Sequence, residues 1–369
     1  MNLTVASKAT TKDRRLYLND FAGLGSACLA VPVLRASEAA SPGMKYSYPS
    51  NPLSRDPHLE RMLDLRGLIA WHPESWRQFR IEDWPDIAAH LRHHRFDAVV
   101  NFRNPDMRQD PLYEQFRDWC RGQSLRMRWY DYYNWPDSHL RDQHVQDRMV
   151  KLLELAGVAT APLDPAWLCS ENISGGAGSE ESPVGIFPSA GTKVKRWPIR
   201  NWIVLARRLL AEHRCVEIIS GASAEERAEA LELFDTVRDE ADLASVNFLT
   251  TRSIYELLNG LRALALLVTN DTGVAHLANA TRIPTLTVFL ATESNVWGPR
   301  SDWACTFQSQ VGRTCILQRV RQGNCERHYG ECDSPCHEGV LPNDVWPTLK
   351  DAVVSPRRGL KDRPMVAAL

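Results

Sequence analysis

The sequence lacks any long hydrophobic run. Although 44% of its 369 residues are hydrophobic, no stretch reaches the roughly 18–20 apolar residues of a membrane-spanning helix. The apolar stretch 23–34 is too short, and Pro32 interrupts it. The N-terminus also lacks the successive basic, apolar and cleavage regions of a signal peptide. We therefore expect a cytoplasmic protein without a transmembrane segment.

An excess of charge of either sign is also missing. Lysine and arginine number 44 and aspartate and glutamate 45, which gives a formal net charge of −1. Broad binding of polyanions needs a strong positive balance, so nucleic acid is not an expected partner. With 24% charged residues, the composition is that of a soluble globular protein, and the length suffices for two domains.

Two recurrent motifs are absent as well. No Gly-x-Gly-x-x-Gly follows the first expected strand at 15–19, which argues against a hydride-transfer enzyme with a dinucleotide cofactor. No Cys-x2-Cys pair occurs either, although the chain has nine cysteines. Because such pairs build the common zinc sites, the usual zinc knuckle is not predicted here.

The cysteines are unevenly distributed. Four are scattered and are interpreted as small core residues: Cys28, Cys120, Cys169 and Cys215. Five crowd the segment 305–336, which also holds His328 and His337. Cytosolic clusters of this kind bind metal more often than they form disulfides. A structural metal, a disulfide and free thiols all stay open for the last four, Cys315, Cys325, Cys332 and Cys336.

Strand and helix patterns alternate through the second half of the chain. Such a βαβ series predicts a parallel sheet covered by helices, with ligands at the carboxyl ends of the strands. Short apolar runs predict strands at 184–187, 216–220, 247–249, 264–269 and 285–289. Helical apolar spacing predicts helices at 199–212, 224–240, 254–262 and 274–280.

The first half carries the same pattern less clearly. The strand at 15–19 leads through a glycine-containing loop into a helix, and a second buried strand is expected at 96–102. Residues 40–57, rich in serine and proline, are expected to form a loop with one edge strand. Helices are expected at 27–35, 87–93 and 143–156.

One strand–turn–helix unit has the features of a phosphate site. The strand at 264–269 leads into Asp271-Thr272-Gly273, where a helix begins. The first N–H groups of a helix are unpaired and carry positive partial charge, so they can bind a phosphate. Asp271 is placed to accept hydrogen bonds as the N-cap. His276 lies about one turn further and is expected to face the ligand; a buried core histidine is the alternative.

A second phosphate-binding element is expected upstream. The strand at 184–187 is followed by a polar loop with Thr192, Lys193 and Lys195, and Pro198 then marks the first turn of a helix. Hydroxyls and lysines at the carboxyl end of a strand suit a diphosphate. Trp197 is better explained by packing between helix and sheet than by stacking on a base.

These elements resemble the heptosyltransferase group, the family-9 glycosyltransferases. The matching segments are Lys195-Arg-Trp-Pro198, a middle strand ending at Gly221, and Asp271-Thr-Gly-Val-Ala-His276, and the match covers roughly 184–298. The resemblance implies an α/β fold of two Rossmann-like domains facing a cleft, called GT-B.

The expected domain boundaries follow from this resemblance and from composition. An acceptor-side domain is placed at 1–168, and the Ser- and Gly-rich segment 169–183 is interpreted as a flexible linker. The nucleotide-sugar domain is placed at 184–345 and includes the Cys-rich loop 305–336. A C-terminal helix and tail are expected at 346–369.

The resemblance also implies a reaction. It is an inverting transfer of a sugar, most simply heptose from ADP-heptose, to an acceptor hydroxyl, with no cofactor required. Glu225 or Glu226 is either a contact for the nucleotide ribose or part of a solvated helix start. The acceptor is a glycan, a natural product or a protein. The residues expected to bind the donor are Ser189, Thr192, Lys195, Gly221, Asp271, Thr272, Gly273 and His276.

The first glycine loop departs from the family pattern. The family has Gly-Asp at the start of the first helix, and that aspartate is held to be the base, whereas this chain has Gly25-Ser26. Serine is a poor base at neutral pH unless a neighbour accepts its proton. We predict that another carboxylate deprotonates the acceptor, with Asp20 of the same loop first and Asp106 or Asp110 next.

Two other functions stay open. A protein that has lost the catalytic aspartate could bind a nucleotide sugar without transferring it. Another sugar-nucleotide enzyme, such as an epimerase, could also use two domains of this kind. The carboxylate that points at the anomeric carbon would distinguish them.

Overall fold

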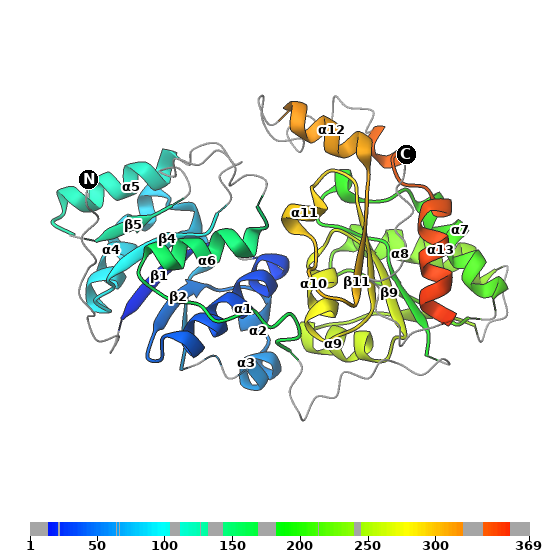
Figure 1. Ribbon diagram of the computed structural model, residues 1–369, viewed down its shortest axis with the longest axis horizontal. Helices are drawn as coiled ribbons and strands as arrows, with labels where there is room; N and C mark the ends of the chain where they lie inside the picture. The colour runs from blue at the N-terminus through cyan, green and yellow to red at the C-terminus, as the bar shows by residue number, and fades with distance from the viewer. Residues whose placement is uncertain are drawn as a thin grey trace.

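A computed structural model describes most of the chain. The described residues are 14–20, 23–63, 65, 67–103, 111–125, 127–131, 143–168, 182–212, 214–239, 245–319 and 335–354. They form two α/β domains side by side (Figure 1), one from each half of the chain. Asp106, Asp110, Cys169, Cys325 and Cys332 lie outside these ranges.

The first half builds a five-stranded parallel sheet in the order β3-β2-β1-β4-β5. Helices α1 to α3 and α6 pack on one face, and α4 and α5 on the other. The strands are β1 (Arg15–Asn19), β2 (Lys45–Pro49), β3 (Ile69–His72), β4 (Ala98–Asn101) and β5 (Arg128–Tyr130). The helices are α1 (Leu24–Ala40), α2 (Pro52–Arg55), α3 (Pro57–Leu63), α4 (Trp84–His93), α5 (Pro111–Gly122) and α6 (Val145–Leu155).

Strand β2 corrects the expectation for residues 40–57. It is not an edge strand, because it pairs with β1 on one side and β3 on the other. Tyr46 and Tyr48 pack into the core, and Ser47 is buried on the opposite face. The alternation of Lys, Tyr and Ser hid this strand, because a buried strand usually consists of aliphatic residues.

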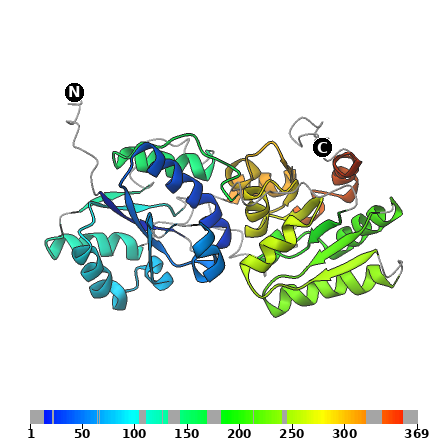
Figure 2. The same cartoon turned by 90° about the horizontal axis from the view of Figure 1, so that it is seen from below.

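The second half builds a six-stranded parallel sheet in the order β11-β10-β9-β6-β7-β8. Figure 2 shows this sheet from below, with helices packed on it. The strands and helices predicted between 184 and 289 agree with the structure to within two residues at each end, whereas the C-terminal helix expected from 346 already begins at Pro342. The strands are β6 (Val184–Phe187), β7 (Val216–Ile219), β8 (Val246–Leu249), β9 (Leu266–Asn270), β10 (Thr285–Phe289) and β11 (Ala304–Gln308). The helices are α7 (Ile199–Ala211), α8 (Ala224–Arg238), α9 (Ile254–Arg262), α10 (Gly273–Ala280), α11 (Ser294–Trp297), α12 (Gln310–Arg319) and α13 (Pro342–Val354).

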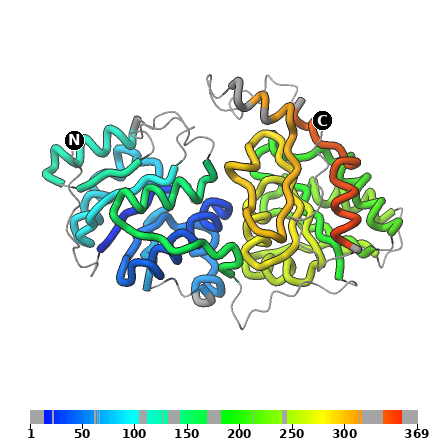
Figure 3. Tube along the Cα trace, in the orientation of Figure 1, coloured from blue at the N-terminus to red at the C-terminus, as the bar shows by residue number. Residues whose placement is uncertain are grey.

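The two halves share one hydrophobic core. Helices α7, α8 and α13 cover the outer face of the second sheet, whereas α9 and α10 lie on the face that meets the first half. Helix α1 packs along α10 (Figure 3), and residues from both sheets join the same buried cluster. Because apolar packing fixes this contact, the carboxyl edges of the two sheets are held close to each other.

The Cys-rich segment is not loop throughout. Cys305 is buried in β11, Cys315 lies in α12, and Cys336 is buried in a short 3-10 helix. Among the described residues, no three His, Cys, Asp or Glu side chains come close enough to hold a metal. Because Cys325 and Cys332 fall outside those residues, a metal in this segment stays a prediction. Cys28 and Cys120 are core residues, as predicted.

Helix length and composition bear on membrane association. In the part of the chain that the structure describes, no helix is both long enough and apolar enough to cross a bilayer.

Candidate active site

Two helix N-termini meet where the halves of the chain face each other. Helix α1 follows β1, and α10 follows β9, each through a glycine-containing turn. A Cβ added to Gly273 would lie 2.7 Å from the Gly25 nitrogen, and one added to Gly25 would lie 3.4 Å from the Gly273 Cα. Glycine at 273 therefore allows the two backbones to approach, and it brings the N-terminal ends of both helices to one place.

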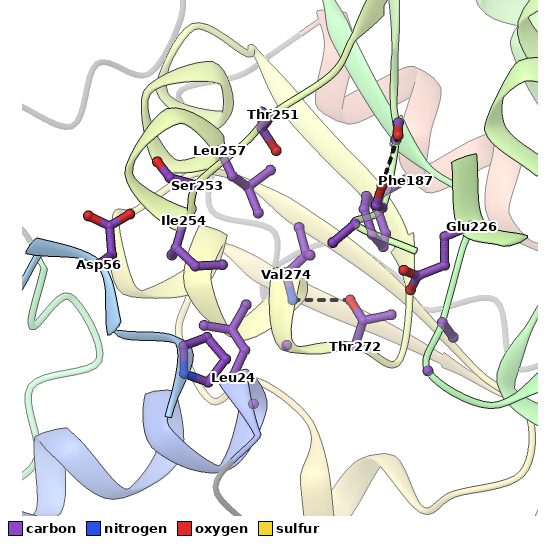
Figure 4. Close-up of a pocket in the computed structure, with 18 of the residues that line it drawn as sticks. Leu24, Asp56, Phe187, Glu226, Thr251, Ser253, Ile254, Leu257, Thr272 and Val274 are labelled. Carbon is purple, nitrogen blue, oxygen red and sulfur yellow. Dashed lines mark hydrogen bonds between the residues drawn. The ribbon is translucent and has the colours of Figure 1, made fainter. Parts of the chain in front are cut away.

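A cavity of about 650 Å³ lies between the halves at this point (Figure 4). That volume is typical of a small-molecule site. The first half lines it with the start of α1, Pro52 and residues 55–58, and the second half with the loops after β6, β7, β8 and β9. Predicted donor-site residues in its wall are Thr192, Lys195, Gly221, Asp271, Thr272 and Gly273.

An ion pair lies in the cavity wall. Lys195 Nζ is 3.0 Å from Asp271 Oδ2, and the Thr292 hydroxyl donates to the same oxygen at 2.6 Å. Burial raises the pKa of Asp271, but the charge of Lys195 and the hydrogen bond from Thr292 outweigh it and lower the net pKa. The site thus holds an ionised carboxylate and an ammonium group side by side, both facing the cavity.

The N-cap of α10 is Thr272, which corrects the expectation for Asp271. The Thr272 hydroxyl accepts a hydrogen bond from the Val274 N–H at 3.1 Å. Because the helix begins at Gly273, the residue before it takes the capping position. The Asp271 carboxylate is thereby left for Lys195 and Thr292.

Asn270 shapes the loop that carries Lys195, and sequence analysis overlooked it. Its Nδ2 donates to the Pro188 carbonyl at 2.5 Å, and its Oδ1 accepts from the Trp197 N–H at 3.0 Å. It thus bridges both ends of the loop that carries Lys195. Trp197 is fully buried and donates through Nε1 to the Val340 carbonyl at 2.7 Å, so its predicted packing role is confirmed.

The Thr192 and Ser189 hydroxyl groups of this loop differ in their hydrogen bonding. The Thr192 Oγ1 is buried and has no hydrogen-bond partner among the described residues, and Thr192 lines the cavity. A buried hydroxyl without a partner costs free energy unless a ligand or water satisfies it. The Ser189 hydroxyl instead donates to the Glu226 carbonyl at 3.2 Å, and Ser189 is absent from the cavity wall.

Glu226 lies in the cavity wall, opposite Gly221. A Cβ on Gly221 would lie 2.6 Å from the Cβ of Glu226, so this glycine leaves room for the glutamate. Glu226 and Ser223 form a reciprocal capping box at the start of α8. Glu225 turns away and pairs with Arg196 at 3.0 Å. Of the two glutamates weighed for a ribose contact, only Glu226 lines the cavity.

His276 is buried beneath the contact between the halves. It is 8% exposed, and its Cδ2 would lie 3.5 Å from a Cβ on Gly25. Burial lowers its pKa to about 4, against the opposing charge of Asp271. The ring is therefore neutral at pH 7. His276 is not in the cavity wall, which fits the alternative of a buried core histidine.

Neither of the two residues expected to be catalytic, Asp20 and Ser26, is among those that line the cavity. Asp20 is 1% exposed, and its Oδ2 accepts a hydrogen bond from the Tyr48 hydroxyl at 2.5 Å. Burial and the charge of Asp20 raise the pKa of Tyr48 well above its usual value, so Tyr48 remains the donor. Ser26 is partly exposed in the first turn of α1. The cavity wall contains their neighbours Leu24 and Gly25 instead.

Two parallel α/β sheets whose carboxyl edges face one cavity, with phosphate-type loops on one side, define a GT-B glycosyltransferase fold. A family model for glycosyltransferase family 9 (heptosyltransferase) matches residues 117–325. The chain belongs to this family. Lipooligosaccharide heptosyltransferase 2 of Haemophilus influenzae is 27% identical over 171 residues, 46% of this chain and 45% of that protein. The match thus spans about half the length of this curated relative.

Solved structures of other glycosyltransferases have the same fold. The Escherichia coli ADP-heptose LPS heptosyltransferase II has a TM-score of 0.58 at 19% identity, with 93% of this chain and 99% of that chain covered. A family 9 glycosyltransferase of Veillonella parvula has a TM-score of 0.64 at 15% identity, with 95% and 100% covered. The iron-containing dodecameric TibC of enterotoxigenic E. coli has a TM-score of 0.55 at 14% identity, with 94% and 78% covered.

Proposed function

We propose that the protein is an inverting glycosyltransferase that moves a heptose from ADP-heptose to an acceptor hydroxyl. The Lys195–Asp271 pair in the interdomain cavity carries this proposal, together with membership of the family. Two solved relatives were determined with such donors. E. coli heptosyltransferase WaaC was determined with ADP and with ADP-2-deoxy-2-fluoro heptose, and TibC with ADP-D-beta-D-heptose.

The cavity groups suit the chemistry of a departing nucleoside diphosphate. Lys195 has three N–H donors, so it can keep its bond to Asp271 and still reach a phosphate oxygen. The Thr192 hydroxyl and the first N–H groups of α10 would add donors on the same side. Because these groups are fixed before the reaction, they would stabilise the charge that develops on the leaving oxygen. Asp271 would orient the sugar.

The acceptor side is proposed from the first half. Asp20 is our first candidate for the general base, with Asp106 and Asp110 next and Ser26 in a positioning role. Asp20 would have to become accessible to an acceptor hydroxyl, since it is buried beside Tyr48. The acceptor is a glycan, a natural product or a protein, and we propose that the reaction takes place in the cytoplasm.

Transfer is proposed to need no divalent metal, because Lys195 and the α10 N-terminus already supply positive charge at the diphosphate. A structural metal in the Cys-rich segment is a separate proposal; TibC is an iron-containing relative. Turnover that persists in EDTA would support the first proposal. Turnover that EDTA abolishes and Mg²⁺ or Mn²⁺ restores would contradict it, whereas rescue by iron or zinc alone would indicate the Cys-rich segment.

Calorimetric titration of ADP into the wild type and Lys195→Ala tests donor binding. Loss of a charge-assisted phosphate contact should weaken binding by about 1.5–3 kcal/mol, or about 10–100-fold. Lys193→Ala is the matched control, because Lys193 pairs with exposed Glu225 at 3.4 Å and does not line the cavity. Equal affinity in wild type and Lys195→Ala would remove Lys195 from the site.

The second candidate is a binding protein that does not transfer its sugar. Ser26 at the family's aspartate position and the burial of Asp20 favour it. Incubation with ADP-heptose and a lipopolysaccharide-core acceptor separates the two functions. Release of ADP together with a heptosylated product supports transfer, whereas tight ADP-heptose binding without release under all acceptor conditions supports the binding protein.

A further inference from the structure

The cavity runs along the carboxyl edge of the second sheet, where Lys195 follows β6, Gly221 follows β7 and Ser253 follows β8, which are neighbours in the strand order. At the β8 end, Pro52 and residues 55–58, from α2 and the start of α3, line it on one side. The start of α9 lines it on the other, where Figure 4 shows Asp56 beside Ser253 and Ile254. With a diphosphate at Lys195, as proposed above, the nucleoside extends past Gly221 towards this end.

One carboxylate caps helices from both halves at this end. Asp56 Oδ1 accepts from the His58 N–H at 3.0 Å and the Leu59 N–H at 3.3 Å, so it caps α3 of its own half. Its Oδ2 accepts from the Tyr255 N–H at 2.8 Å, in the first turn of α9. Burial raises the pKa of Asp56, but the backbone N–H groups outweigh it and lower the net pKa, so the carboxylate is ionised at pH 7.

Helix α9 takes its N-cap from Ser253, whose hydroxyl accepts from the Glu256 N–H at 3.1 Å and is also hydrogen-bonded to Asp56. The Asp56–Tyr255 bond is therefore additional to what the helix needs and joins the two halves. The His58 and Tyr255 rings stack beside it, with centroids 5.0 Å apart and planes inclined by 22°. A charge-assisted hydrogen bond and a ring stack thus join the two halves at the same end of the cavity.

A second connection between the halves lies outside the cavity and provides a comparison. Arg300 forms two bonds to Asp147, at 2.6 and 2.8 Å, and both side chains are 47% exposed. His144 Nε2 lies 2.9 Å from the Gly298 carbonyl close by. None of these residues lines the cavity. The two connections therefore differ in whether they border the site, although each joins the same two halves.

We propose that Asp56 is a positioning residue that holds the first half of the chain over the nucleoside end of the donor cavity. The proposal rests on the proposed donor site. A contact that forms only when the two halves are closed over the cavity raises the fraction of molecules in that closed state. When this fraction falls, the apparent affinity for the donor falls in proportion. Asp56 thereby couples nucleotide binding to closure, whereas the Asp147–Arg300 pair contributes little to closure because both side chains are about half exposed.

Asp56→Asn tests this with the least damage to the fold. Asparagine is a good N-cap, so its oxygen keeps the α3 cap, but its NH2 group then faces the Tyr255 N–H. By calorimetry, we expect the Kd for ADP to rise about tenfold, the low end for a charge-assisted bond. Asp147→Ala should change the Kd less than twofold, because exposed pairs contribute little. Thermal unfolding without ADP checks that each variant is folded.

Hydrogen exchange at the Tyr255 amide gives a second readout. ADP should slow this exchange in the wild type and in Asp147→Ala, and leave it unchanged in Asp56→Asn. Equal ADP affinity and equal protection in Asp56→Asn and wild type would overturn the proposal. So would equal weakening by Asp56→Asn and Asp147→Ala, because that result marks a general effect of loosening the halves. If wild type binds no ADP at all, the proposed donor site fails, and the closure proposal fails with it.

Discussion

Helices α1 and α10 start from the same strand–turn–helix geometry but present different chemistry where they meet. At α10, Lys195 and Thr292 surround Asp271, and Thr272 caps the helix. At α1, Gly23 is the N-cap without a side-chain bond, and the first turn has no acidic residue. The turn fixes where a helix end points, whereas residues from other elements decide which charges it presents.

This difference distinguishes the residues proposed for the donor from the residue proposed as the base. Lys195, Asp271 and Thr192 all line the cavity, so a diphosphate bound as proposed would reach them with little movement. Asp20 is buried against Tyr48 instead. To act as the proposed base, Asp20 would therefore have to exchange its bond to Tyr48 for one to the acceptor hydroxyl.

The largest effect is expected from the acceptor side. A positioned general base contributes about 10²–10⁴-fold in rate, so Asp20→Asn should lower kcat by that order. ADP affinity should stay nearly unchanged, because the donor loops belong to the other half. Ser26→Ala should cost much less. ADP release and ADP calorimetry on both variants measure these effects.

The reverse pattern would change the assignment. If Ser26→Ala silences the enzyme and Asp20→Asn does not, the serine is catalytic or positions the acceptor. If neither change matters, the base lies outside this loop, and Asp106 and Asp110 become the residues to mutate.

A smaller loss is expected from crowding the meeting point of α1 and α10. The added Cβ in Gly273→Ala would lie 2.7 Å from the Gly25 nitrogen and 2.8 Å from the Leu24 Cβ. The helix ends must then separate, and a displacement of about 1 Å costs on the order of 10² in rate. Gly122→Ala is the control, because Gly122 is not in the cavity wall and an added Cβ meets nothing within 4 Å. Equal kcat/KM for the two variants would mean that the approach of the two helices is not needed.

The smallest effect concerns the pH dependence of stability. It compares His276, beneath the contact between α1 and α10, with His144, at the second connection between the halves. Burial lowers the pKa values of His276 and His144 to about 4, from 6.5. Between these values the unfolded chain binds protons that the folded protein does not, so stability is lost as pH falls from 6.5 towards 4. Each histidine contributes about 1.4 kcal/mol per pH unit in this window.

Urea unfolding at pH 7 and pH 5 measures this slope. His144→Gln removes one titrating group and should make the slope shallower by its share. If the slope is unchanged in His144→Gln, the pKa of His144 is the same in the folded and the unfolded protein.

The alternation of strands and helices between 184 and 289 could be predicted from the sequence. Apolar runs and helical spacing placed each of these elements to within two residues, because both periods are strong there. Beyond 289, β11 and α12 were overlooked, because they lie in a segment expected to be loop. The first half was harder. The serine and proline residues around Tyr46 and Tyr48 made β2 resemble a loop, and β3 and β5 were overlooked because they are only four and three residues long.

What the sequence determined by itself is local. A strand, a glycine and a helix start follow from neighbouring residues, and Lys195, Asp271 and Gly273 could be singled out from this local pattern together with the family resemblance. Contacts between distant residues needed the tertiary structure. Asn270 bridges Pro188 and Trp197, Thr292 reaches Asp271, and Asp56 meets Tyr255 across 199 positions. No sequence period relates such partners, because only the packing of the two sheets brings them together.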